Sequence, residues 1–211
     1  MTRRLPPTIH WPRRYRMRKP LGAIILAVAL SLGVYYQRSI HPPLVTERTV
    51  RSDDHDRYHD RPFRVVHVVD GDTVDIDEPD RGKPKTRIRL WGVDSPEVGH
   101  GRNADMHFGP EAKTFAEETL AGQTVWIVLA PNDTRDKFDR LLAYVFLERG
   151  GTMFNELLIE QGFAYADPRF HHPYDDAFTT IEKRAQRTKI GLWSAVPADQ
   201  LPSWRQRAER P

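Results

Sequence analysis

Apolar and polar residues alternate in several short stretches, as they do in strands with one buried face. In one stretch, Ile88 and Leu90 share a face, whereas Arg87 and Arg89 share the opposite face. The dipeptide Asp70-Gly71 follows another stretch and favours a tight turn between two strands. The pattern predicts strands at residues 62–69, 74–77, 86–93, 123–130 and 141–147.

Three later segments repeat apolar residues with the period of a helix. The first runs from Gly109 to Leu120 and has a proline in its first turn, where proline is tolerated. The second is expected at 152–160 with Thr152 as its N-cap, and the third spans 174–189. Strands dominate the first part and helices come late. The fold expected is therefore α+β: a five-stranded OB-fold barrel with three helices.

The N-terminal region differs from the rest of the chain. Residues 1–20 carry seven Lys and Arg and no acidic residue, and the next stretch, up to residue 36, is uncharged and almost wholly apolar. Basic residues tend to stay in the cytoplasm, so we expect a basic cytoplasmic arm at 1–20 and a transmembrane signal anchor at 21–37. The remainder would then lie outside the cytoplasm, tethered to the cell membrane. A cleaved signal peptide and a secreted protein are the alternative, but no A-x-A-like site follows the apolar run.

The other segments divide by composition and charge. Residues 38–61 are polar and broken by prolines, which predicts a linker. Residues 62–194 form the expected domain, with a formal charge of −5, and 195–211 form a C-terminal tail in which Trp204 is a possible anchor onto the domain. An acidic domain does not grip nucleic acid by bulk positive charge. The absence of cysteine excludes disulfide scaffolds, thiolate metal sites and cysteine nucleophiles.

Three loops collect charged residues in the predicted domain. Asp72 lies in the first loop, Asp94 and Glu97 lie in the second, and the third spans 134–140. Carboxylate and carbonyl oxygens suit Ca²⁺, and a further carboxylate such as Glu97 can orient or deprotonate a water. Arginines directed at the same point would bind a phosphodiester. Each loop alone is compatible with an ordinary turn, but the three together indicate a site.

The stretch from about 63 to 194 resembles the thermonuclease (staphylococcal nuclease-like) family. The segments that carry the resemblance are VVDGDTV (68–74), RIRLWGVDSPE (87–97), FGPEAKTFAEE (108–118), TRDKFDRLLAYVF (134–146), FNELLIEQGFA (154–164) and KIGLWS (189–194). The resemblance implies an OB-fold barrel that binds Ca²⁺ and hydrolyses phosphodiester bonds of DNA and RNA.

The resemblance also implies roles for particular residues. Asp72 and Asp94 would provide carboxylates to Ca²⁺, Ser95 would provide a backbone carbonyl, and Asp70 would be an outer-shell carboxylate. Glu97 would activate or position the attacking water.

Four further residues would contact the substrate. Arg89 and Arg140 would bind phosphate and act in catalysis, and Lys137 and Phe138 would be substrate-binding. Phe138 stands where the best-known member of the family has tyrosine, so a hydroxyl contact to phosphate is lost. The tyrosine that stacks near the base has no clean match.

The expected protein is thus a monomeric, membrane-tethered, Ca²⁺-dependent nuclease with little sequence specificity and 3′-phosphate products. A non-catalytic OB-fold module that binds nucleic acid or protein is the alternative, which loss of the carboxylates or arginines would favour.

Overall fold

The computed structural model describes residues 53–99, 104–131 and 133–208. The predicted basic arm, the predicted membrane anchor at 21–37 and most of the predicted linker lie outside the described residues. Within those residues, no helix combines the length and the apolar character needed to cross a membrane.

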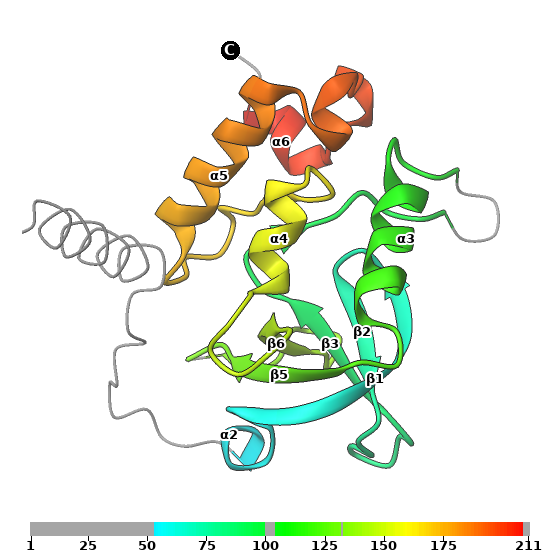
Figure 1. Ribbon diagram of the computed structural model, residues 1–211, viewed down its shortest axis with the longest axis vertical. Coiled ribbons are helices and arrows are strands. Elements are labelled where there is room, and N and C mark those ends of the chain that lie inside the picture. Colours follow the sequence, from blue (N-terminus) through cyan, green and yellow to red (C-terminus); the bar gives the residue numbers. More distant parts are fainter. Residues whose placement is uncertain (1–52, 100–103, 132, 209–211) are drawn as a thin grey trace, which may run out of the picture. The chain divides into compact units, whose positions relative to one another are not determined.

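Five strands close into a barrel, as the alternating pattern predicts (Figure 1). Around the barrel they follow the order β1 (Arg61–Asp70), β2 (Thr73–Ile76), β3 (Thr86–Leu90), β6 (Leu141–Phe146) and β5 (Thr124–Leu129). Strands β3 and β6 pair in parallel, and the other neighbours pair antiparallel. Closure leaves the barrel without a free edge.

The three predicted helices are present around the barrel. They are α3 (Gly109–Leu120), α4 (Phe154–Glu160) and α5 (Asp175–Thr188). Helix α3 packs on β1, whereas α4 packs on β6 and on α5 (Figure 1). A small second sheet pairs β4 (Val93–Asp94) with β7 (Tyr165–Ala166) and links the chain after β3 to the segment after α4.

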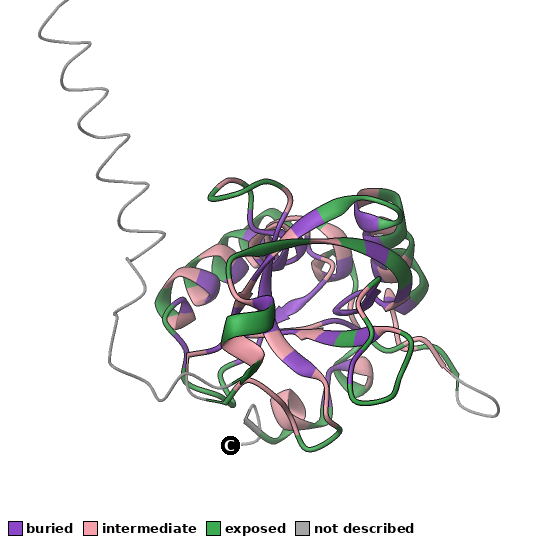
Figure 2. Cartoon of the chain, turned by 90° about the horizontal axis from the view of Figure 1, so that it is seen from below, coloured by how far each residue is buried: buried purple, intermediate pink, exposed green. Residues whose placement is uncertain are grey.

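The core lies inside the barrel and beneath the helices (Figure 2). Strand β3 confirms the predicted alternation, because Ile88 and Leu90 are buried whereas Arg87 is exposed. Helix α3 buries Ala112, Ala116 and Leu120, which recur with helical spacing. The barrel and its helices therefore form a fixed frame for the loops at its rim.

Two local expectations were wrong. Thr152 does not cap a helix, because α4 begins at Phe154 and its N-cap position is Met153; Thr152 lies in the turn after β6, where its carbonyl accepts a hydrogen bond from Leu147 N. The predicted linker also extends too far. Residues 53–58 form helix α2 (Asp53–Tyr58), whose Tyr58 is fully buried, and β1 already starts at Arg61.

The described residues include the predicted tail as far as residue 208. The tail forms a short 3-10 helix, η2 (Ala198–Gln200), and helix α6 (Ser203–Ala208), and it follows another 3-10 helix, η1 (Gly191–Ser194), at the end of the predicted domain. Leu201 is buried against Tyr165 and Leu192 in a small apolar cluster outside the barrel.

Candidate active site

The turn between β1 and β2 brings Asp72 into the protein. Gly71 permits this, because a Cβ there would lie 2.8 Å from the Ser95 side chain. Asp72 is buried and its backbone N–H donates to Asp70 Oδ1 at 3.2 Å. Ser95 N donates to Asp72 Oδ2 at 2.7 Å, so the first and second predicted loops are joined directly.

Arg89 lies between the two predicted metal carboxylates. Its Nη1 is 3.0 Å from Asp72 Oδ2, and its Nη2 is 2.8 Å from Asp94 Oδ1. The guanidinium also donates to the carbonyls of Leu90 and Val93 at 2.8 and 2.7 Å. The side chain that the strand pattern places away from the core is therefore largely buried and holds both acidic loops together.

The surroundings of Asp72 and Asp94 disfavour the ionised forms of both carboxyls, and Arg89 offsets this only in part. The pKa of Asp72 is raised to about 6, chiefly by burial and also by nearby Asp70, while Arg89 and the hydrogen bond from Ser95 N oppose the rise. Burial and the charge of Asp72 likewise raise the pKa of Asp94. The folded protein therefore holds two carboxyls that repel each other when both are ionised.

Glu97 lies within electrostatic reach of both carboxylates and both predicted arginines. Glu97 retains an exposed surface. The protein around its carboxyl nevertheless displaces part of the solvent, and this desolvation is the main cause of its raised pKa. Asp72 and Asp94 raise this pKa further, whereas Arg89 and Arg140 lower it. The charges of the predicted carboxylates and arginines thus act on Glu97.

The third loop positions Arg140 beside an exposed aromatic ring. Arg140 Nε donates to Asp136 Oδ2 at 2.7 Å, and its guanidinium lies 5.5 Å from the centre of the Phe138 ring. Lys137 Nζ lies 5.0 Å from the centre of the same ring. Phe138 is 65% exposed, so its ring is available to a ligand.

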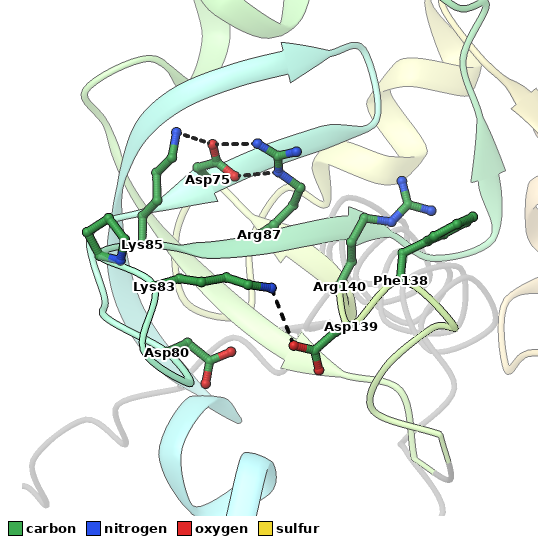
Figure 3. Close-up of a pocket in the computed structure, with 9 residues that line it drawn as sticks. Asp75, Asp80, Lys83, Lys85, Arg87, Phe138, Asp139 and Arg140 are labelled. Carbon is green, nitrogen blue, oxygen red and sulfur yellow. Dashed lines mark hydrogen bonds and ion pairs between the residues drawn. The ribbon is translucent and has the colours of Figure 1, made fainter.

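Two cavities flank this loop. One, of about 390 Å³, lies beside Arg140 and is bordered by Lys83, Lys85 and Arg87 (Figure 3). There Lys83 points to Asp139, whereas Lys85 and Arg87 share Asp75 (Figure 3).

The other cavity, of about 490 Å³, extends from Arg89 and Arg140 to Phe138 and Phe170. Phe170 is 61% exposed. A basic cavity edged by exposed aromatic rings offers a phosphate site together with surfaces on which bases can stack.

The donor set fits a hard divalent cation. Asp72, Asp94 and the Ser95 carbonyl are oxygen donors of the kind Ca²⁺ takes, and a cation would stabilise the ionised forms of two carboxyls whose pKa values are raised by burial and by each other's proximity or that of Asp70. In the described ranges, no group of three or more His, Cys, Asp or Glu side chains could hold a metal ion. Water or substrate oxygens would have to complete the coordination.

The sequence reasoning missed two residues at Asp94. Trp204 Nε1 donates to Asp94 Oδ2 at 2.7 Å, and Arg169 Nη2 lies 3.2 Å from the same oxygen. Trp204 had been expected to anchor the tail, but not to reach a predicted metal ligand. The run of charged and aromatic residues around Asp167 and Phe170 was the available signal for Arg169.

Comparisons with known proteins show the family to which the chain belongs. The model of the family described as staphylococcal nuclease homologue matches residues 87–195. A thermonuclease from Staphylococcus intermedius is 32% identical over 176 residues, which cover 82% of this chain and 95% of that protein. A thermonuclease from Staphylococcus hyicus is 34% identical over 139 residues, covering 64% and 78%, and a micrococcal nuclease from Shigella flexneri is 30% identical over 149, covering 67% and 78%. The chain therefore belongs to the family of staphylococcal nuclease homologues.

Proposed function

We propose that this chain is a Ca²⁺-dependent nuclease that hydrolyses phosphodiester bonds of DNA and RNA with little sequence specificity. The observation that carries the proposal is the convergence of Asp72, Asp94 and Glu97 with two arginines at one rim of the barrel. The relatives named thermonuclease and micrococcal nuclease support the same reaction class.

The carboxylates and arginines have distinct roles in this proposal. Asp72, Asp94 and the Ser95 carbonyl would hold Ca²⁺, which when bound would polarise a phosphoryl oxygen and orient a water. Glu97 accepts the proton as the water oxygen attacks phosphorus. Burial and the neighbouring carboxylates raise the pKa of Glu97, which makes it a better proton acceptor than an ordinary glutamate.

The substrate side of the site lies toward the cavity that joins Arg89 and Arg140 to the exposed phenylalanines. The two guanidiniums would meet the charge that grows on the non-bridging phosphoryl oxygens. The bond from phosphorus to the 5′-oxygen breaks, so one product ends in a 3′-phosphate and the other ends in a 5′-hydroxyl once the leaving oxygen has taken up a proton from solvent. Stacking on Phe138 and Phe170 tolerates any base, which agrees with weak sequence preference.

The membrane tether is part of the proposal and rests on the sequence of residues 1–37 alone. It would place the nuclease outside the cytoplasm, where free Ca²⁺ reaches the roughly 10⁻⁴–10⁻³ M range at which weak extracellular sites fill. Two carboxylates and a carbonyl form such a weak site. Compartment and metal requirement are therefore consistent with each other.

Cleavage of single-stranded DNA and of RNA by the purified chain tests both the Ca²⁺ requirement and the role of Glu97 as proton acceptor. We expect activity that rises between sub-millimolar and millimolar Ca²⁺ and disappears with excess chelator. Glu97→Gln should lower kcat by about 10²–10⁴-fold, because the proton acceptor is lost. Its binding of Ca²⁺ should persist, because both aspartates remain.

Glu118→Gln is a suitable control, because it removes an exposed glutamate from α3. Undiminished cleavage in chelator would refute the metal requirement. Normal turnover in Glu97→Gln, with circular dichroism showing an intact fold, would refute the assigned base.

A further inference from the structure

The C-terminal cap, which we define as residues 196–207, folds back onto the rim that carries the site. The family model ends at residue 195, so the cap lies outside the region by which the family was matched. Leu201 of the cap is buried beside Tyr165 of β7. Because β7 pairs with β4, the cap rests on the same small sheet that carries Asp94.

An ion pair fixes the cap at this position. Arg205 donates to both carboxylate oxygens of Glu182, at 2.7 and 3.0 Å. Glu182 is buried in α5, and its Oε1 also accepts a hydrogen bond from Ala166 N at 3.1 Å. A bidentate pair with a buried glutamate holds an arginine in one geometry. The Arg205–Glu182 pair therefore also holds the backbone of the neighbouring Trp204 in place beside the site.

Trp204 completes the hold on the Asp94 carboxylate. Its indole N–H donates to Oδ2 at 2.7 Å, whereas Arg89 donates to Oδ1 at 2.8 Å from the other side. Arg169 lies 3.2 Å from Oδ2 and 5.1 Å from the centre of the Trp204 ring. A carboxylate has about four lone-pair sites. The two hydrogen bonds and the ion pair with Arg169 therefore restrain its rotation and still leave a site for a cation.

The chemistry of the indole suits this position. An indole has a single N–H and no charge, so it orients Asp94 without adding a positive charge that would repel a cation. Hydrogen-bond donors to a metal-binding carboxylate generally fix its orientation and contribute to metal affinity. The rigid ring also packs beneath the Arg169 guanidinium, which limits its own freedom.

We propose that Trp204 is a positioning residue that holds Asp94 in the orientation needed to bind the divalent cation. The C-terminal cap is then part of the active site. This inference rests on the proposed Ca²⁺ site, and it adds a residue 110 positions away from Asp94 in the sequence.

The test replaces Trp204 by Phe, which keeps an aromatic ring over Arg169 and removes the N–H. Trp193→Phe is the matched control. An arginine, Arg205, lies over the Trp193 ring as Arg169 lies over the Trp204 ring. The Trp193 N–H, in contrast, has no hydrogen-bond acceptor among the described residues. Calcium titration calorimetry should show about 10–100-fold weaker binding for Trp204→Phe. Trp193→Phe should bind Ca²⁺ like the wild type.

A second measurement uses the metal-free protein. In ¹⁵N NMR spectra, Asp94→Asn should shift the indole resonance of Trp204 and leave that of Trp193 in place. Thermal unfolding of both phenylalanine variants establishes that they remain folded. An unmoved Trp204 resonance would contradict the contact itself.

The outcomes separate the two proposals. If the wild type cleaves with Ca²⁺ and Trp204→Phe binds Ca²⁺ equally well, the positioning role is refuted and the proposed function stands. Tighter binding in Trp204→Phe would refute it too, because the indole would then compete with the metal. If the wild type neither binds Ca²⁺ nor needs it for cleavage, the proposed function fails, and the role of Trp204 fails with it.

Discussion

Asp72 illustrates how a single residue can cost stability in order to serve a site. Its carboxylate is buried, and it accepts hydrogen bonds from Ser95 N and Thr73 Oγ1 and pairs with Arg89. Burial nevertheless raises its pKa to about 6. The ionised form is therefore less favourable in the folded chain than in the unfolded chain, where the pKa is near 3.8.

Asp72→Asn should stabilise the metal-free protein at neutral pH. The folded state binds more protons than the unfolded state between about pH 4 and 6, so wild-type stability falls as pH rises through this window. Asparagine does not titrate, so the variant does not lose this stability. Its free energy of unfolding should exceed that of the wild type by an amount that levels off above pH 6 at about 1–3 kcal/mol, since each pKa unit is worth about 1.4 kcal/mol. Urea unfolding of both proteins in chelator, from pH 4.5 to 8, measures the difference.

The same variant should lose Ca²⁺ binding, because one of the two carboxylates is gone. A stability difference that does not change with pH, or a less stable variant at pH 7, would contradict the assigned pKa shift.

The turn between β3 and β4 shows how an element positions the site. Gly92 has φ of +78°, and its carbonyl accepts a hydrogen bond from Asp167 N at 3.0 Å. The His172 ring lies directly against it, because a Cβ on residue 92 would be 2.5 Å from that ring. Two residues later the chain presents Asp94, so the packing of this turn determines where the carboxylate lies.

Gly92→Ala should destabilise the protein more than Gly82→Ala does. Both glycines have positive φ, +78° and +81°, but no atom lies within 4 Å of a Cβ built on Gly82. Gly82→Ala should therefore cost only the backbone strain, about 1–2 kcal/mol. At Gly92 the overlap with His172 should add about 1–3 kcal/mol. Chemical denaturation of the two variants measures both costs, and equal costs would mean that the His172 ring yields freely.

At the scale of the whole molecule, contacts divide the chain into Met1–His41 and Pro42–Pro211. The residues that form the proposed site all belong to the second unit. The proposed membrane segment belongs to the first, and residues 38–52 between it and α2 are polar or proline-rich. Catalysis and anchoring should therefore be separable.

A chain of residues 38–211 should be soluble without detergent and cleave nucleic acid with the same kcat/KM as the full chain. The full chain should sediment with membranes, because its apolar N-terminal segment is retained. Cell fractionation followed by an assay of each fraction measures both. An intact full chain found wholly in the soluble fraction would refute the anchor, whereas a new N-terminus beyond Tyr36 would indicate a cleaved signal.

The sequence alone was sufficient to predict the barrel strands and the types of residue in the loops at the rim of the barrel. Strand alternation and the Asp70-Gly71 turn are local properties, so they predict the β1–β2 hairpin and the buried face of β3 without knowledge of the fold. The start of α4 was misplaced because Thr152 belongs to the turn after β6, where its backbone carbonyl accepts a hydrogen bond from Leu147 N.

The three-dimensional structure decided which residues meet. Nothing in the local pattern indicates that Arg89 turns inward to join two carboxylates, or that Tyr58 makes α2 part of the domain. Trp204 and Asp94 are 110 positions apart, and no periodicity links them. Such contacts arise because β4, β7 and the C-terminal cap pack together. The sequence thus determined the secondary-structure elements and the types of side chain available to the candidate site, whereas long-range packing determined the geometry of that site.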